Sequence, residues 1–185
     1  MLVGKVLRSP HAHAILKSID TSAAEALPGV RAVVTRNDFP DLPAGTGPGD
    51  LTRNCMAREK VLYDGHPVAA VAATSESIAK AALKLIKVEY EVLPHVIDPV
   101  AAMQPGAPIL HPHVRTKGSK DKDAATKQTN VVDRLDLGIG DVDKGFAAAD
   151  LIIEREYDSS PMHQSYIEPQ GCVASCGDDG QIDLW

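Results

Sequence analysis

The sequence predicts an α+β protein that combines a mixed sheet of short strands with a few short helices. Residues 30–35 and 67–73 are rich in apolar and β-branched side chains and are bounded by turn residues, as strands are. Residues 75–86 carry apolar side chains three and four positions apart and begin with Ser75, which is typical of a capped amphipathic helix. With a strand at 88–93, the order strand, helix, strand predicts a right-handed crossover within one sheet.

The first 35 residues alternate between strand-like and turn-like stretches. Residues 2–8 and 14–20 are predicted strands, and Pro10 between them fixes the backbone and lacks a donor for a ladder. We therefore expect a hairpin or a crossing pair. A short helix over residues 23–27, capped by a preceding hydroxyl residue, leads into the strand at 30–35.

The middle of the chain begins with residues 40–48, which hold three prolines and two glycines and are predicted to be a loop. Residues 60–63 are a predicted short strand, followed by a turn at Asp64-Gly65. Residues 67–73 are mostly apolar and are predicted to be buried on both faces. The two strands and their turn indicate a hairpin.

After the strand at 88–93, regular structure becomes sparse. Residues 98–103 are predicted to be a short capped turn of helix, and prolines then make residues 105–112 an extended connector. Residues 116–128 are mainly Lys, Asp, Ser, Thr and Ala with almost nothing to bury. This composition predicts a solvated linker.

The last third of the chain contains another set of short elements. A helix over residues 144–149 is predicted, with Asp141 placed to accept hydrogen bonds from its first amides. Residues 151–158 and 171–176 are predicted strands. A turn at 178–180 leads from the second of them into the start of a returning strand.

Charge and composition exclude several classes of function. The net charge of -6 and the scattered basic residues argue against nucleic-acid binding. No apolar run approaches the roughly 20 residues of a membrane span. Three cysteines are an odd number and do not indicate a disulfide framework, so a cytoplasmic location is expected.

Two pairs of histidines are candidate metal ligands. His11 and His13 lie two residues apart, as do His111 and His113. Neither pair has a Cys or carboxylate at a familiar metal-binding spacing, so loop histidines are the preferred interpretation.

Two further pairs of polar residues fall in the last third of the chain. Cys172 and Cys176 are expected on one face of a strand, too far apart for one metal ion, and are interpreted as buried small side chains. Glu168 and His163 are five residues apart and could exchange a proton, but a structural role is preferred. No Gly-x-Ser-x-Gly motif or phosphate loop is present, so these residues alone indicate no particular chemistry.

Four phrases, read in order, resemble the α/β-hammerhead domain of the xanthine dehydrogenase and aldehyde oxidase family. They contain Arg8-Ser9-Pro10-His11-Ala12-His13-Ala14, Pro28-Gly29-Val30, Tyr63-Asp64-Gly65-His66-Pro67 and Val88-Glu89-Tyr90-Glu91-Val92. The hammerhead of that family is a structural and docking module, so the resemblance implies a structural role for Gly65 and Pro67. The family usually has Gln at the position of His66, which is expected to be a surface polar residue.

Residues 140–150, the phrase from His163 to Pro169 and residues 180–185 resemble the first strands of the molybdopterin-binding domain that follows the hammerhead. The resemblance implies structural roles for His163, Glu168 and Pro169. It places the molybdenum-contacting Gln, the Gly-rich cofactor loop and the catalytic Glu of the family beyond Trp185. We therefore predict no catalytic, cofactor-binding or metal-binding residue in this chain.

The resemblance implies a division into a hammerhead domain at 1–110, a polar connector at 111–130 and an incomplete molybdopterin-binding segment at 131–185. The chain is expected to be the N-terminal part of the large subunit of a molybdenum hydroxylase of the xanthine dehydrogenase, aldehyde oxidase or 4-hydroxybenzoyl-CoA reductase type, and to be inactive alone. The alternative is a non-catalytic hammerhead module that docks to partner subunits.

The same resemblance implies the cofactors and partners. Molybdopterin is expected in the complete subunit and not on this chain alone, with iron-sulfur clusters and FAD in partner chains. The expected partners are the remainder of the subunit, the iron-sulfur and FAD subunits and a second copy. An exposed sheet edge and Trp185 also predict self-association.

Overall fold

The computed structural model describes residues 1–118 and 126–185, so residues 119–125 of the predicted linker lie outside the described residues. The chain forms two compact units, Met1–Leu137 and Gly138–Trp185, which are described separately. Among the described residues, no helix has both the length and the apolar character needed to cross a lipid bilayer.

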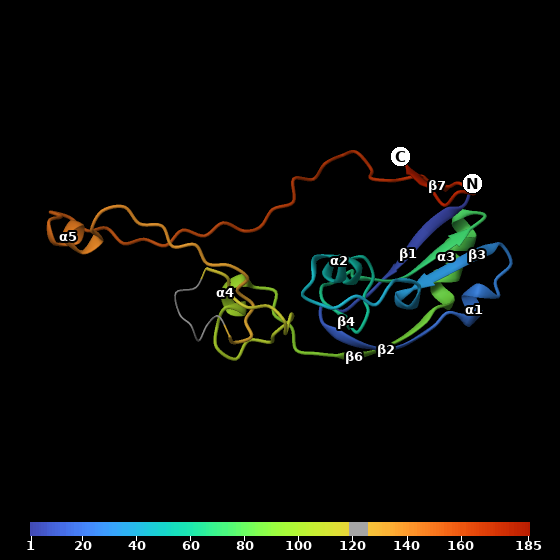
Figure 1. The fold of residues 1–185 in the computed structure, drawn as a ribbon, viewed down its shortest axis with the longest axis horizontal. Helices are drawn as coiled ribbons and strands as arrows, with labels where there is room; N and C mark the ends of the chain where they lie inside the picture. The colour runs from blue at the N-terminus through green and yellow to red at the C-terminus, as the bar shows by residue number, and fades with distance from the viewer. Residues whose placement is uncertain (119–125) are drawn as a thin grey trace. The chain divides into compact units, whose positions relative to one another are not determined.

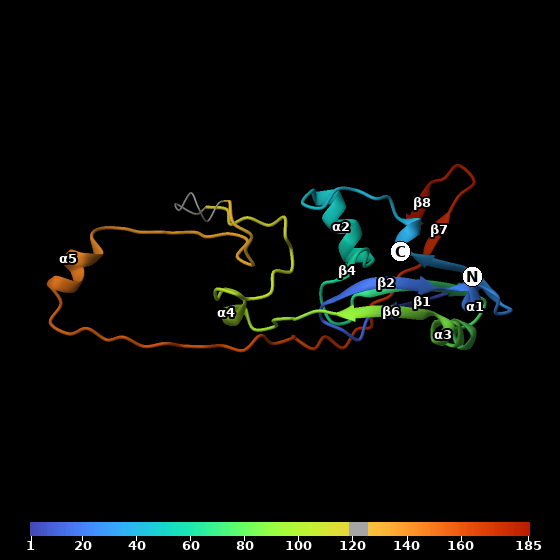
Figure 2. The same ribbon diagram turned by 90° about the horizontal axis from the view of Figure 1, so that it is seen from below.

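The first unit contains two antiparallel three-stranded sheets (Figures 1 and 2). Its strands are β1 (Val3–Arg8), β2 (Ala14–Asp20), β3 (Val30–Thr35), β4 (Lys60–Val61), β5 (Pro67–Ala73) and β6 (Lys87–Val92). One sheet has the order β1-β5-β3 and the other has the order β4-β2-β6. The α+β class is confirmed.

Two predictions of strand pairing are wrong. The strands β5 and β6 flank a helix as expected, but they belong to different sheets, so α3 does not form a crossover between strands of one sheet. The strands β4 and β5 do not form a hairpin, because β4 pairs with β2 while β5 pairs with β1 and β3. The chain likewise passes from one sheet to the other between β1 and β2, which agrees with a crossing pair.

The helices of the first unit are α1 (Ser22–Glu25), α2 (Gly47–Cys55), α3 (Glu76–Leu85) and α4 (Pro99–Ala102), with the 3-10 turn η1 (Arg36–Asp38). The hydroxyl of Ser75 caps α3 by accepting from the Ile78 amide, as predicted. The carboxylate of Asp98 caps α4 by accepting from the Ala101 amide.

Helix α2 was not predicted from the sequence, because it begins inside the segment predicted to be a loop. Its cap is Thr46, whose hydroxyl accepts a hydrogen bond from the Gly49 amide. Pro48 lies in the first turn, where the amide that proline lacks would have no helical partner in any case. Residues that break the interior of a helix therefore form the beginning of this one.

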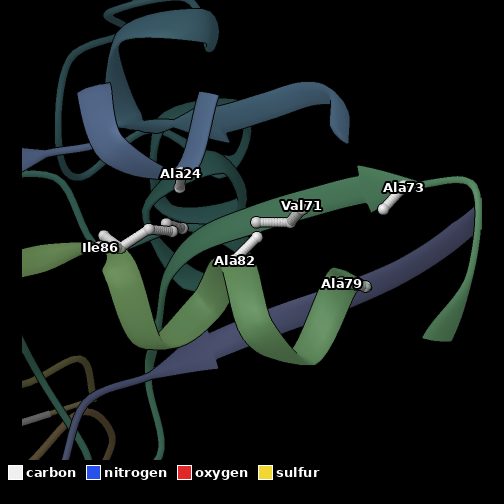
Figure 3. Close-up of a cluster of buried hydrophobic side chains, with 7 residues drawn as sticks. Ala24, Val71, Ala73, Ala79, Ala82 and Ile86 are labelled. Atoms are coloured by element: carbon white, nitrogen blue, oxygen red, sulfur yellow. The ribbon is translucent and has the colours of Figure 1, made fainter. Parts of the chain in front are cut away.

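The core lies on both faces of β5, as predicted. Helix α3 covers one face of the β1-β5-β3 sheet, and Figure 3 shows Ala79 and Ala82 of α3 beside Val71 and Ala73 of β5. The other face of β5 places Val68 against residues of the β4-β2-β6 sheet. Leu7 contacts both clusters. A strand that is apolar on both faces needs cover on both sides, which a helix and a second sheet provide here.

We expect Ala82→Leu to lower the free energy of unfolding by about 1–3 kcal/mol, because Ala82 is fully buried where α3 meets β5 and a larger side chain would overpack that contact. The matched control is Ala81→Leu on the exposed side of the same helix, where the change should stay within about 0.5 kcal/mol. Urea unfolding of both variants measures the difference. Equal destabilisation by the two substitutions would contradict the tight packing of α3.

The second unit contains α5 (Val142–Ala147) and the antiparallel pair β7 (Ala174–Cys176) and β8 (Ile182–Leu184). The side chain of Asp141 caps α5 by accepting from the Lys144 amide, as predicted. The hairpin predicted around residues 178–180 is confirmed.

Two predictions for the second unit are wrong. Residues 151–158 form no strand, because they have no neighbouring strand with which to pair. Cys172 and Cys176 are exposed rather than buried. All residues of this unit are exposed, including large apolar side chains such as Ile153, Ile167 and Trp185. A unit with so little buried surface has no core of its own.

Candidate functional site

The turn between β4 and β5 carries the chain from one sheet to the other. Gly65 adopts a φ of 78°, which favours glycine, and its amide donates to the Ser9 carbonyl at 3.0 Å. The carbonyl of Pro67 accepts from the Ala57 amide at 2.8 Å. Both residues thus lie where β1, β5 and the segment after α2 meet, and their structural role remains a prediction.

His66 lies at the end of this turn, directly before β5, with no exposed surface, so its expected place on the surface is wrong. Its Nδ1 accepts from the Leu62 amide at 3.2 Å, and its Nε2 lies 2.7 Å from the Arg53 carbonyl oxygen. A carbonyl can only accept, so the proton is assigned to Nε2. The ring stacks on Tyr63 with centroids 4.2 Å apart. Burial lowers the pKa of His66, which favours the neutral ring that both hydrogen bonds require.

This turn also holds the C-terminal end of α2. The last carbonyls of a helix have no partner within it. Here the carbonyl of Arg53 meets His66, and the carbonyl of Asn54 accepts from the Tyr63 hydroxyl at 3.0 Å. The sequence between β4 and β5 therefore fixes the position of α2.

Two arginine side chains hold the loop before α2 in place. The guanidinium of Arg53 contacts the carboxylate of Glu59 at 3.1 Å and also donates to the Leu42 carbonyl. The guanidinium of Arg58 donates to the carbonyls of Arg36 and Phe39, at 3.0 and 2.6 Å. Both side chains are about 15% exposed, so these contacts are partly shielded from water.

A cavity of about 540 Å³ lies between α2, residues 58–62, residues 110–114 and Val132. We call it the α2 cavity. Its walls are mainly apolar and include Leu62, Leu110, Pro112 and Val114. The volume is typical of sites that hold a small organic molecule.

The carboxylate of Asp50, on α2, and the ring of His113 both line the α2 cavity and lie close together, with Oδ1 and Nε2 3.5 Å apart. Asp50 Oδ1 also accepts from the Gly45 amide at 2.9 Å. Gly45 has a φ of 81°, and a Cβ at this position would lie 3.2 Å from the His113 ring. A glycine therefore lets the segment 110–114 approach the loop before α2.

Asn130 fixes the position of a segment that lines the α2 cavity. Its amide nitrogen donates to the carbonyls of Ala102 and Pro108, at 3.1 and 2.9 Å, and its oxygen accepts from the Leu110 amide at 3.3 Å. One side chain thus joins α4 to the segment that carries His111 and His113.

The four histidines of the two pairs each make contacts of their own. The rings of His111 and His113 meet edge to face with centroids 5.8 Å apart, and burial together with His113 lowers the pKa of His111. His13 is buried, with Nδ1 2.7 Å from the Pro94 carbonyl oxygen, while His11 packs against Tyr90. Within residues 1–118 and 126–185, no three His, Cys, Asp or Glu side chains gather to hold a metal ion.

The family-motif residues of the second unit are all exposed. His163 accepts from the Ser165 amide at 3.0 Å and lies against the Tyr166 ring. Glu168 makes no hydrogen bond or ion pair with the described residues, so the structure does not join it to His163. The structural roles of His163, Glu168 and Pro169 remain predictions.

Neither the α2 cavity nor the roles of Asp50 and Asn130 were predicted from the sequence. One signal for α2 was present, because Thr46 followed by Pro48 is a typical beginning of a helix. No local signal marks Asn130, whose partners lie 20 to 28 residues earlier in the chain.

Comparison with protein families adds two matches. Residues 1–94 match the model described as the aldehyde oxidase and xanthine dehydrogenase a/b hammerhead domain. Residues 123–185 match the model described as the molybdopterin cofactor-binding domain. The first of these matches covers more than half of the chain.

Individual proteins resemble the chain over nearly all of its length. The carbon monoxide dehydrogenase large chain of Afipia carboxidovorans is 39% identical over 190 residues, which is 100% of this chain and 23% of that protein. The probable hypoxanthine oxidase XdhD of Escherichia coli K12 is 41% identical to this chain. The match covers 95% of this chain and 21% of that protein. The chain thus spans about a fifth of the length of these relatives.

Solved structures show the same resemblance. A Cu,Mo-CO dehydrogenase in its carbon monoxide reduced state matches with a TM-score of 0.83 and 36% identity, over 100% of this chain and 24% of that one. Quinoline 2-oxidoreductase from Pseudomonas putida 86 matches with a TM-score of 0.77 and 30% identity, over 100% of this chain and 23% of that one.

Proposed function

Because this chain belongs to the aldehyde oxidase and xanthine dehydrogenase family, we propose that it serves as the N-terminal part of the large, molybdopterin-binding subunit of a molybdenum hydroxylase. The observation that carries this proposal is the order of the two family matches, with the hammerhead at 1–94 and the molybdopterin-binding match at 123–185. We retain the division into a hammerhead at 1–110, a connector at 111–130 and a molybdopterin-binding segment at 131–185.

The proposed reaction of the whole protein is the hydroxylation of an aldehyde or N-heteroaromatic carbon with oxygen from water, or the reduction of an aromatic thioester. The relatives named above are oxidoreductases that act on small molecules, which supports this class of reaction. When bound, a molybdenum cofactor supplies the redox chemistry, while protein groups orient the substrate.

We expect that the residues of this chain do not form a site for that cofactor by themselves. The side chains of 138–185 are exposed, so they enclose no buried donors for a pterin or its phosphate. The described residues also gather no three metal-ligating side chains. The contribution proposed for this chain is therefore to provide a folded hammerhead and a surface on which further polypeptide packs.

The second unit supports a role in assembly. Its large apolar side chains, among them Leu151, Ile153 and Tyr157, are between 69 and 89% exposed. Such a surface becomes stable when other polypeptide covers it. The relatives include large chains of enzymes built from several subunits. The proposed partners are the remainder of the subunit, iron-sulfur and FAD subunits and a second copy, in the cytoplasm.

A chimera tests the proposal. In the A. carboxidovorans large chain, the region that aligns with this chain is replaced by residues 1–185, and the product is made with its partner subunits in a host that synthesises molybdopterin. We expect the purified complex to contain molybdenum and fluorescent pterin, and residues 1–185 alone to contain neither. The unmodified large chain is the positive control.

Two results would contradict the proposal. Stoichiometric molybdenum and pterin on residues 1–185 alone would show that the chain forms the cofactor site unaided. A chimera that assembles with its partner subunits but lacks molybdenum and pterin would favour a docking module without a role in cofactor binding.

A further inference from the structure

We propose that the α2 cavity is a binding site for a planar aromatic molecule that carries a cationic nitrogen with N–H groups, and that the Asp50 carboxylate is its anchor. This inference goes beyond the molybdenum chemistry proposed above and uses only residues of the first unit. It rests on the shape of the α2 cavity, on the apolar walls and on which polar groups in the lining still have hydrogen-bonding capacity.

The walls favour a flat apolar ligand. Leu62, Leu110, Pro112 and Val114 line a space of about 540 Å³, which is large enough for an aromatic ring system. The rings of His111 and His113 meet at 71° and form a corner against which a planar ring can stack.

The arginines of the lining are already used. Arg53 pairs with Glu59 at 3.1 Å, and Arg58 donates to two main-chain carbonyls and lies 3.6 Å from Asp41. Their positive charges are thus balanced by neighbours. An anionic ligand would have to displace one of these contacts.

Asp50 differs from these residues because its carboxylate is only partly used. Oδ1 accepts from the Gly45 amide and faces His113, whereas Oδ2 has no hydrogen bond among the described residues. A carboxylate accepts up to four hydrogen bonds. An amidinium or similar group can donate two parallel N–H bonds to it, which is a strong and directional contact.

The remaining cation of the lining is Lys60, which makes no ion pair with the described residues. Its ammonium is a flexible point charge on a long stem and can stay in water, whereas Asp50 is held in place on α2. A fixed acceptor selects the orientation of a ligand better than a mobile donor. This difference between the two residues leads to a cationic rather than an anionic ligand.

Three isosteric probes test the proposal on the full chain. Benzamidine carries the cationic fork, benzamide is its neutral counterpart and benzoate is its anionic counterpart. Backbone amide shifts in NMR titrations give both the affinity and the place of binding. We expect benzamidine to shift the amides of residues 44–54 and 110–114, with benzamide at least about tenfold weaker and benzoate weaker still.

Substitutions identify the anchor. Asp50→Asn keeps an oxygen for the Gly45 amide but removes the charge, and it is expected to weaken benzamidine binding about tenfold or more. Asp64→Asn, an exposed acid that does not line the α2 cavity, is the matched control and should leave the affinity unchanged.

The proposal is overturned if benzoate binds as tightly as benzamidine, if the benzamidine shifts fall outside residues 44–62, residues 110–114 and Val132, or if Asp50→Asn leaves the affinity unchanged while its spectrum shows the native fold. Failure of the molybdenum chimera has no bearing on this result, because the probes need no cofactor.

Discussion

His66→Ala is expected to lower the free energy of unfolding by about 3–5 kcal/mol. The substitution removes a fully buried ring from the place where the chain passes between the two sheets. It leaves a cavity beside Tyr63 and takes away the partners of the Leu62 amide and of the Arg53 carbonyl. Cavity formation and unsatisfied buried groups are among the costliest effects of a single substitution. Urea unfolding at pH 7.5 measures the loss.

The same residue is expected to make the protein sensitive to acid. Burial lowers the pKa of His66 in the folded state below the 6.5 of a free histidine, so the unfolded chain binds a proton more readily. Stability linked to His66 is therefore complete above pH 6.5 and is lost as the pH falls from 6.5 towards the folded pKa.

The matched variant for this pH effect is His66→Gln, because an amide side chain has both a donor and an acceptor but does not titrate. Its free energy of unfolding should fall less than that of the native protein between pH 7 and pH 5. An identical pH dependence in the two proteins would show that His66 does not become protonated on unfolding in this range.

Removal of residues 138–185 is expected to convert a self-associating chain into a monomer that keeps its fold. The core clusters of the protein consist entirely of residues from the first unit. In the second unit, the exposed fractions of Ile153, Ile167 and Trp185 are 69, 98 and 71%. Exposed apolar side chains drive association. Residues 1–137 should therefore scatter light as a monomer at concentrations where the full chain forms larger species.

The control keeps the chain length and changes only those apolar side chains. The full chain with Ile153→Ser, Ile167→Ser and Trp185→Ser should associate less than the unchanged chain. Thermal unfolding of residues 1–137 should match the main transition of the full chain. A monodisperse monomer of the full chain at high concentration, or an unfolded 1–137 fragment, would refute this expectation.

Local sequence was enough to predict elements whose physical cause lies within a few residues. The cap of α3 at Ser75, the cap of α4 at Asp98 and the cap of α5 at Asp141 each join a side chain to an amide three residues later. The burial of β5 on both faces followed from its unbroken apolar composition. Four short phrases in order were enough to indicate the family, which the matching models confirm.

The partners of the strands were decided by tertiary structure. A strand pattern specifies which face is apolar, but it does not specify the strand that supplies the neighbouring hydrogen bonds. The expected hairpin of β4 and β5 did not form for this reason: the segment between them, which places the buried side chain of His66, sends the two strands into different sheets. Residues 151–158 do not form the strand that was expected there, because no neighbouring strand pairs with them.

The candidate site likewise could not be predicted from the sequence. The sequence by itself determined the helix caps, the two-faced strand and the family, because each depends on neighbouring residues or on phrases that can be read directly. Only the tertiary structure brought Asp50 within 3.5 Å of His113 and joined Asn130 to Ala102 and Leu110. These contacts span 20 to 63 residues of chain, and such distances close only when the whole unit packs around its core.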